Sequence, residues 1–125
     1  MSQSIADLHA QLIAYLEEGK FAEGIEDFYA DDVVAREGLA EANRGRTALA
    51  EAERVFLKKV TAYHGLEVHA TAIDEQSPGT GTVFYETTMK WDQSDKGAVE
   101  VVQAVVERWR DGRIEDIRFY GNFEG

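Results

Sequence analysis

The stretch ERWRDGRIEDIRFY, residues 107–120, alternates apolar and polar side chains on both sides of an Asp-Gly pair at 111–112. An Asp-Gly pair between two strand-like runs favours the tight turn of a β-hairpin. Turn residues at 77–79 and 93–97 divide the preceding part of the chain in the same way. The sequence therefore predicts four long antiparallel strands, at about residues 64–75, 81–92, 98–110 and 113–123. Strands of about ten residues favour a strongly curved sheet.

The N-terminal half has helical periodicity instead. Apolar side chains recur every three or four residues from Ile5 to Leu16, from Phe21 to Phe28 and from Leu49 to Val60. We expect Ser4 or Ser2 to cap the first of these helices, Gly19 to end it, and Thr47 to cap the third. Asp31 and Asp32 are predicted to end the second helix, before a short strand at 33–37 and a polar loop at 38–44.

These elements predict an α+β fold in one domain, residues 1–125. A cone-shaped, curved antiparallel sheet, made of one short strand and four long ones, would wrap around three N-terminal helices in the order α-α-β-α-β-β-β-β. A sheet bent around helices leaves a cavity at its open end, which is a common place for a small-molecule ligand.

Composition excludes several classes of function. The net charge of −11 disfavours binding to nucleic acid and to anionic membranes, because both depend on Lys and Arg. The absence of cysteine excludes disulfides and thiolate chemistry. His9, His64 and His69 lack the spacing of metal ligands, so we expect no metal. With no secretory signal at the N-terminus and no long apolar run, the prediction is a cytoplasmic protein.

Three motifs together resemble one known family: FYADDVVARE at 28–37, RGRTALAEAERVFLKK at 44–59, and the hairpin at 107–120. In this order they are similar to the nuclear transport factor 2-like superfamily, most of all to its SnoaL-like and ketosteroid isomerase-like branches. The resemblance implies a conical α+β barrel with a deep pocket, which commonly dimerises through the outer face of its sheet. It does not imply one activity, because the superfamily holds isomerases, cyclases, dehydratases, hydrolases and binding domains.

The resemblance points to a first catalytic candidate. In the isomerase branch a carboxylate that moves a proton lies eight residues after the tyrosine of the YADD motif, and that position is Glu37 in this chain. The isomerase's two oxyanion donors would fall near Ala10 or Gln11 and near Val105, which cannot serve, so the chain departs from the isomerase pattern. Tyr15, about one turn further along the first helix, is the candidate replacement.

Strand alternation assigns faces to the predicted sheet. Val83, Tyr85, Thr87, Met89 and Trp91 share one side of their strand, which we expect to face the helices. The next strand is apolar on both sides, and since the helices cover only one face, the other predicts a homodimer through the outer face of the sheet.

Matching the hairpin to the family places Val105, Glu107 and Trp109 inside. An apolar site disfavours a charged carboxyl group, which would suit Glu107 to proton transfer as the partner of Glu37. Two alternatives stay open: Glu107 forms a structural ion pair with Arg36, Arg46 or Arg108, or Glu37 turns to solvent.

The favoured hypothesis is a cofactor-independent isomerase, cyclase or dehydratase that acts on a small, apolar, oxygenated molecule. Glu37 would move the proton, and Glu107 or Tyr15 would supply the complementary hydrogen bond. The expected ligand contacts are Tyr63, Tyr85, Met89, Trp91, Val105, Trp109 and Phe119. The alternatives are a non-catalytic ligand-binding or dimerisation domain and, third, a protein-interaction module.

Overall fold

The computed structural model describes residues 3–122. In chain order its elements are α1 (Ile5–Glu17), α2 (Phe21–Phe28), β1 (Tyr29–Glu37), β2 (Asn43–Arg44), α3 (Arg46–Leu57), β3 (Val60–Ser77), β4 (Thr80–Gln93), β5 (Gly97–Arg110) and β6 (Arg113–Gly121). The predicted α+β architecture and the order of its main elements are confirmed.

The strands form one open sheet in the order β2-β1-β6-β5-β4-β3. Strands β3 to β6 pair antiparallel with their sequence neighbours, as predicted. Two features differ from the prediction: β1 runs parallel to β6, and the predicted polar loop contains the short strand β2, which pairs with β1. A long connection can join two strands in parallel or antiparallel pairing. The alternation of side chains within β1 shows neither the direction nor the identity of its neighbouring strand.

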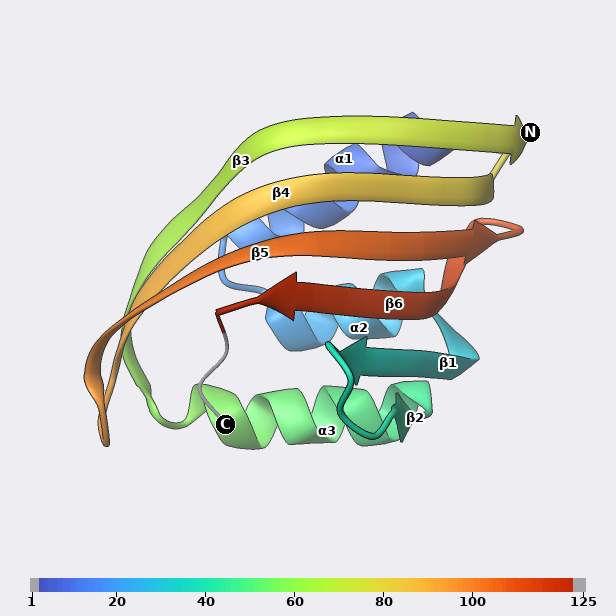
Figure 1. Cartoon of the computed structure of the whole chain (residues 1–125). Coiled ribbons are helices and arrows are strands. Elements are labelled where there is room, and N and C mark those ends of the chain that lie inside the picture. Colours follow the sequence, from blue (N-terminus) through green and yellow to red (C-terminus); the bar gives the residue numbers. More distant parts are fainter. Residues whose placement is uncertain (1–2, 123–125) are drawn as a thin grey trace.

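The sheet bends strongly, and β3, β4 and β5 all curve at the end nearest the last turn of α3 (Figure 1). Register shifts in β3, including those between Tyr63 and Gly65 and between Val68 and Ala70, are sites where one strand carries an extra residue. Such bulges bend a strand, and the positive φ of 102° at Gly65 is a conformation that glycine adopts without strain. Helix α1 packs against β3 and β4, and α3 against β1 and β2.

The Asp-Gly pair forms the predicted turn between β5 and β6. Arg110 and Arg113 are directly paired, and both intervening residues have positive φ, 49° at Asp111 and 82° at Gly112. These are the backbone angles of the hairpin turn whose twist matches that of the flanking strands. The turn sets the register that points Glu107 and Trp109 inward.

Helix and strand boundaries bear out some local predictions and correct others. The Ser4 hydroxyl accepts a hydrogen bond from the Asp7 backbone N–H at 3.2 Å, so Ser4 caps α1. Thr47 is not a cap: α3 starts one residue earlier, after Gly45, whose N–H donates to the Val33 carbonyl at 2.9 Å. This backbone bond ties the start of α3 to β1.

Asp31 and Asp32 do not end a helix either. Strand β1 already begins at Tyr29, directly after α2, so both aspartates lie within the strand. The regular pairing with β6 is interrupted between Tyr29 and Val34, and Asp31 forms an ion pair with Arg46 at the start of α3.

The core lies between the helices and the concave face of the sheet. Ile5, Val33, Val83, Val105 and Ile114 are at most 1% exposed. On β4 the buried residues include Val83, Tyr85 and Thr87, as alternation predicted. On β5 they include Val105, Glu107 and Trp109, as the family resemblance implied.

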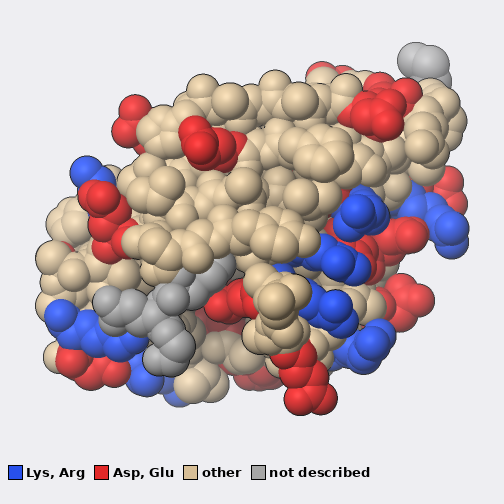
Figure 2. All heavy atoms as spheres, viewed as in Figure 1, with Lys and Arg blue, Asp and Glu red and all other residues tan. Residues whose placement is uncertain are grey.

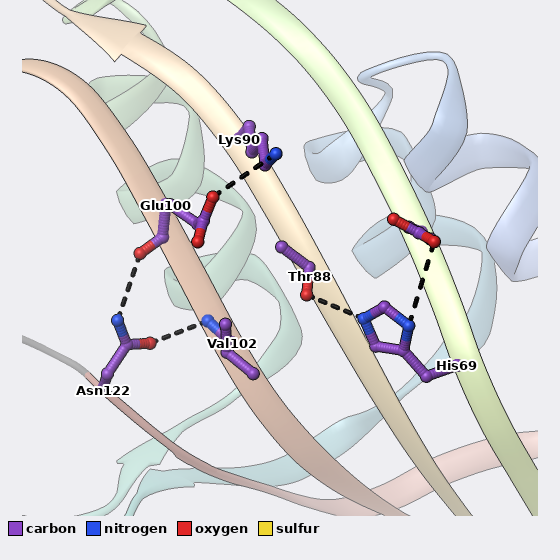
Figure 3. A network of polar contacts seen from close by, with 7 residues as sticks. His69, Thr88, Lys90, Glu100, Val102 and Asn122 are labelled. Atoms are coloured by element: carbon purple, nitrogen blue, oxygen red, sulfur yellow. Dashed lines mark hydrogen bonds and ion pairs between the residues drawn. The ribbon is translucent and has the colours of Figure 1, made fainter.

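The convex face of the sheet is open to solvent and mixed in character. Figure 2 shows a largely uncharged expanse over the upper strands, and Phe84, Val102 and Tyr120 are 43–47% exposed. A polar network borders it (Figure 3), in which the Asn122 side chain accepts from the Val102 N–H at 2.7 Å and donates to the Glu100 carbonyl at 3.2 Å. These bonds fix the end of β6 to β5.

Candidate functional site

A cavity of about 540 Å³ lies between the helices and the concave face of the sheet. Its walls are mainly apolar, with Leu16 and Phe21 from the first two helices, Leu49 and Phe56 from α3, and Leu66 from β3. A cavity of this size and lining is typical of small-molecule sites.

Most of the predicted contact residues lie in this wall. Five of the seven line the cavity: Tyr63, Tyr85, Met89, Trp91 and Phe119. Val105 and Trp109 are instead packed behind the wall, at 1% and 2% exposed. Glu37 and Glu107, the two predicted carboxylates, line the same cavity.

Glu107 is the most completely buried charged residue in the described part of the chain, with 0% exposure. Its Oε1 accepts a hydrogen bond from the Trp109 indole N–H at 3.1 Å and lies 2.8 Å from His9 Nδ1. Its Oε2 has no hydrogen-bond partner among residues 3–122. A buried oxygen without a partner carries a substantial desolvation cost, which a ligand in the cavity would relieve.

His9 reaches Glu107 from α1. It occupies the apolar stripe of that helix, between Ile5 and Leu12, and is 5% exposed. The imidazole also packs edge-on against the Tyr85 ring, with centroids 4.7 Å apart. His9 therefore holds Glu107 in place, in the position where arginines were expected.

Two buried phenols lie near this carboxyl group. Burial, and next the charge of Glu107, raise the pKa of both Tyr29 and Tyr85 well above the usual tyrosine value. Both phenols line the cavity wall and stay protonated at neutral pH, so each can donate a hydrogen bond to a ligand oxygen.

A second pair of carboxylates borders the cavity, where β1 meets α3. Glu37 ends β1 and is exposed, whereas Glu53 in α3 is only partly exposed. Burial, and next the charge of Glu37, raise the pKa of Glu53. Glu37 thus lies at the exposed mouth of the cavity, and its charge acts on Glu53.

Tyr15 lies apart from these groups. It is not among the residues that line the cavity, and its hydroxyl donates to Asp27 Oδ2 at 2.7 Å. That hydrogen bond, more than burial, raises the pKa of Tyr15.

Sequence reasoning missed His9, Tyr29 and Glu53. Two of them had a detectable signal: His9 lies four residues after Ile5, and Glu53 four residues after Leu49, so both are polar residues on apolar helix stripes. Tyr29 served only as a counting reference, because its strand was expected to start later.

The described residues contain no cluster of three or more His, Cys, Asp or Glu that could hold a metal ion. Among the helices of this part of the chain, none has the length and apolar content that crossing a membrane requires.

We expect His9→Leu to lower the free energy of unfolding by about 3 kcal/mol, because it removes the partner of a fully buried carboxyl group. Urea denaturation at pH 7 measures the change. The matched control is His64→Leu, since His64 forms an exposed pair with Asp92 at 3.1 Å and should cost less than about 1 kcal/mol. Equal losses in the two variants would contradict the structural role of His9.

The raised pKa of Glu53 predicts that the stability of the protein depends on pH. A carboxyl group whose pKa is higher in the folded protein than in the unfolded one destabilises the fold above its unfolded pKa, of about 4.3 for Glu, and not at lower pH. We expect Glu53→Gln to be more stable than the wild type at pH 8, with the difference shrinking toward pH 4. Urea denaturation at both pH values tests this, with the exposed Glu51→Gln as control. A difference in unfolding free energy that does not change with pH would contradict the raised pKa of Glu53.

Comparisons with other proteins show that solved structures share this fold. No protein-family model matches the sequence, and no curated protein is significantly similar to it. The fold is similar to an LEH-like epoxide hydrolase from Mycobacterium tuberculosis (TM-score 0.73, 19% identity, covering 93% of this chain and 76% of that one). It is also similar to a ketosteroid isomerase-like protein from Erwinia carotovora atroseptica (0.71, 14%, covering 96% and 95%).

A third similar structure is an NTF2-like protein of unknown function from Cytophaga hutchinsonii (TM-score 0.66, 13% identity, covering 93% of this chain and 97% of that one). Since all these identities are below 20%, the similarity concerns the fold and not the activity. The chain has the nuclear transport factor 2-like fold shared by SnoaL-like and ketosteroid isomerase-like proteins, as its sequence motifs predicted.

Proposed function

We propose that this protein binds a small, apolar, oxygenated molecule in its cavity and catalyses a proton transfer on it without a cofactor, as an isomerase, cyclase or dehydratase. The observation that carries the proposal is Glu107, a fully buried residue that lines a mainly apolar cavity and whose Oε2 has no hydrogen-bond partner among residues 3–122. General bases of this kind need both a reachable substrate and a dry surrounding.

The neighbours of Glu107 suit this chemistry. Glu107 Oε2 would take a proton from the carbon next to a substrate carbonyl. The electron pair of that C–H bond would form a C=C bond while the π pair of the carbonyl moves to its oxygen. The phenol of Tyr85 or Tyr29 would donate a hydrogen bond to the resulting enolate oxygen. Returning the proton to a different carbon completes an isomerisation. In a dehydration the enolate re-forms the carbonyl, the β-hydroxyl group leaves, and it takes the proton from Glu107 to become water.

Glu107 is better placed for this step than Glu37, to which the family resemblance points. Glu37 is exposed at the cavity mouth, where water screens its charge, whereas Glu107 is enclosed and held by His9 and Trp109. Fixed orientation and exclusion of water both favour proton transfer. We therefore assign the proton transfer to Glu107 and a ligand-binding role to Glu37.

A non-catalytic binding domain is the second candidate. It is favoured by the position of Tyr15, whose hydroxyl is bonded to Asp27 and not directed into the cavity wall. Its function would rest on the apolar cavity alone.

We also propose that two copies associate through the convex face of the sheet. The support is the exposure of three large side chains, Phe84, Val102 and Tyr120, on neighbouring strands of a face that no helix covers. A second copy would remove this apolar surface from water.

The catalytic proposal predicts exchange of the α-protons of a bicyclic ketone, 2-decalone, with D₂O. We expect the wild type to accelerate the exchange. In Glu107→Gln the enzyme-catalysed exchange should be about 100-fold slower, because glutamine keeps the side-chain shape but cannot take a proton. Proton NMR measures the exchange, and Glu67→Gln, a change to an exposed strand glutamate, is the control.

Binding of 2-decalone without faster exchange would favour the non-catalytic function instead. Wild-type rates in Glu107→Gln would overturn the role of Glu107.

The dimer proposal predicts that Phe84→Lys shifts the molecular mass measured by light scattering from that of two chains to that of one. A lysine in the centre of the interface would have to lose its hydration on association. The control is Val55→Lys on α3, where an apolar side chain is 58% exposed away from the sheet. A monomeric wild type would contradict this proposal.

A further inference from the structure

We propose that the ligand of this cavity carries a protonated amine, which binds between Glu37 and Glu53 at the mouth while the apolar body fills the interior. This inference rests on the proposed function, because it requires the cavity to take a small molecule. It adds the chemical class of that molecule.

The first support is the position of the two carboxylates. Glu37 comes from the last residue of β1 and Glu53 from the middle of α3, and both line the cavity. Within residues 3–122 neither side chain forms an ion pair or a hydrogen bond. Two like charges at one opening repel each other, and a cation between them would turn this repulsion into attraction.

Two arginines, Arg36 and Arg44, also border the cavity, and their positive charges could pair with the two carboxylates. The register places Arg36 opposite Arg118, and Glu37 opposite Phe119. Because side chains alternate along a strand, Arg36 points to the face opposite that of Glu37. Arg44 pairs with Val34 and therefore shares the face of Arg36.

The electrostatics of Glu53 agree with this geometry. A guanidinium group in contact with Glu53 would lower its pKa, whereas burial and the charge of Glu37 raise it. Both arginines line the cavity, but among residues 3–122 neither forms an ion pair with Glu37 or Glu53.

A second polar group faces the same cavity from deeper in the fold. Glu107 is fully buried, and its Oε2 lacks a partner in the described part of the chain. The cavity therefore offers acceptors at two places, with apolar walls between them. A matching ligand has an apolar skeleton, a protonated amine at one end and a hydroxyl or carbonyl group toward the other.

An organic cation fits this arrangement better than a metal ion. Metal sites in proteins usually draw on three or more side-chain ligands, and the described residues provide no such cluster. The apolar walls, with Leu49 and Phe56 of α3 flanking Glu53 in sequence, add contact area for the carbon skeleton of an amine.

The test compares two probes of equal shape, 1-aminoadamantane, which is protonated at pH 7, and the neutral 1-adamantanol. We expect the wild type to bind the amine about tenfold more tightly than the alcohol by isothermal titration calorimetry. Glu53→Gln and Glu37→Gln should each remove most of this preference by weakening binding of the amine. Glu51→Gln, an exposed change two residues from Glu53 on the same helix, should keep the full preference.

The outcomes separate this inference from the proposed function. Equal binding of amine and alcohol by the wild type would overturn the amine inference and leave the cavity a binding site. Absence of binding by both probes would count against both. Because Glu37 is exposed, Glu37→Gln should fold like the wild type, and an unchanged preference in that variant would also overturn the inference.

Discussion

The contact between His9 and Glu107 joins the two halves of the molecule. It links residues 98 positions apart in the sequence, one on the first helix and one on the penultimate strand. A carboxyl group with no exposure needs hydrogen-bond donors, and Trp109 supplies one from the same strand while His9 supplies the second contact from α1. The position of α1 over the sheet is therefore coupled to the site, and a shift of the helix would leave Glu107 without its partner.

The cavity follows from the same arrangement. Bulges in β3 bend the sheet around the helices, and the helices fill only part of the concave side. Polar side chains in the cavity wall, such as Glu53 and Glu107, interrupt otherwise apolar surroundings. Their burial costs stability, and such costs are common at functional sites.

Part of this arrangement could be predicted from the sequence. The Asp-Gly pair predicted the hairpin of β5 and β6, whose turn pairs Arg110 with Arg113. The family resemblance pointed to Val105, Glu107 and Trp109 as inner residues of that hairpin, and all three are buried. Counting from Tyr29 by the same resemblance pointed to Glu37, which lines the cavity. The hairpin could be predicted because its deciding residues lie close together in the sequence.

The predictions that failed depend on distant contacts. No local pattern shows that β1 runs parallel to β6, or that Glu107 is paired with a histidine of the first helix rather than with an arginine. The start of α3 was misplaced because Gly45, which a backbone bond ties to β1, and not Thr47 precedes its first turn. Glu53 became a site residue only once α3 was placed beside the end of β1.

The pairing of β1 with β6 also has a consequence for folding. Tyr29 lies opposite Ile114, about 85 residues later in the chain, whereas the hairpins of β3 to β6 join much nearer neighbours. Closing so long a loop costs more chain entropy than closing a hairpin, and it is repaid only when the four later strands already offer β6 as an edge. Glu37 lies on the strand that bears this cost, so the mouth of the cavity depends on a strand pairing between distant parts of the sequence.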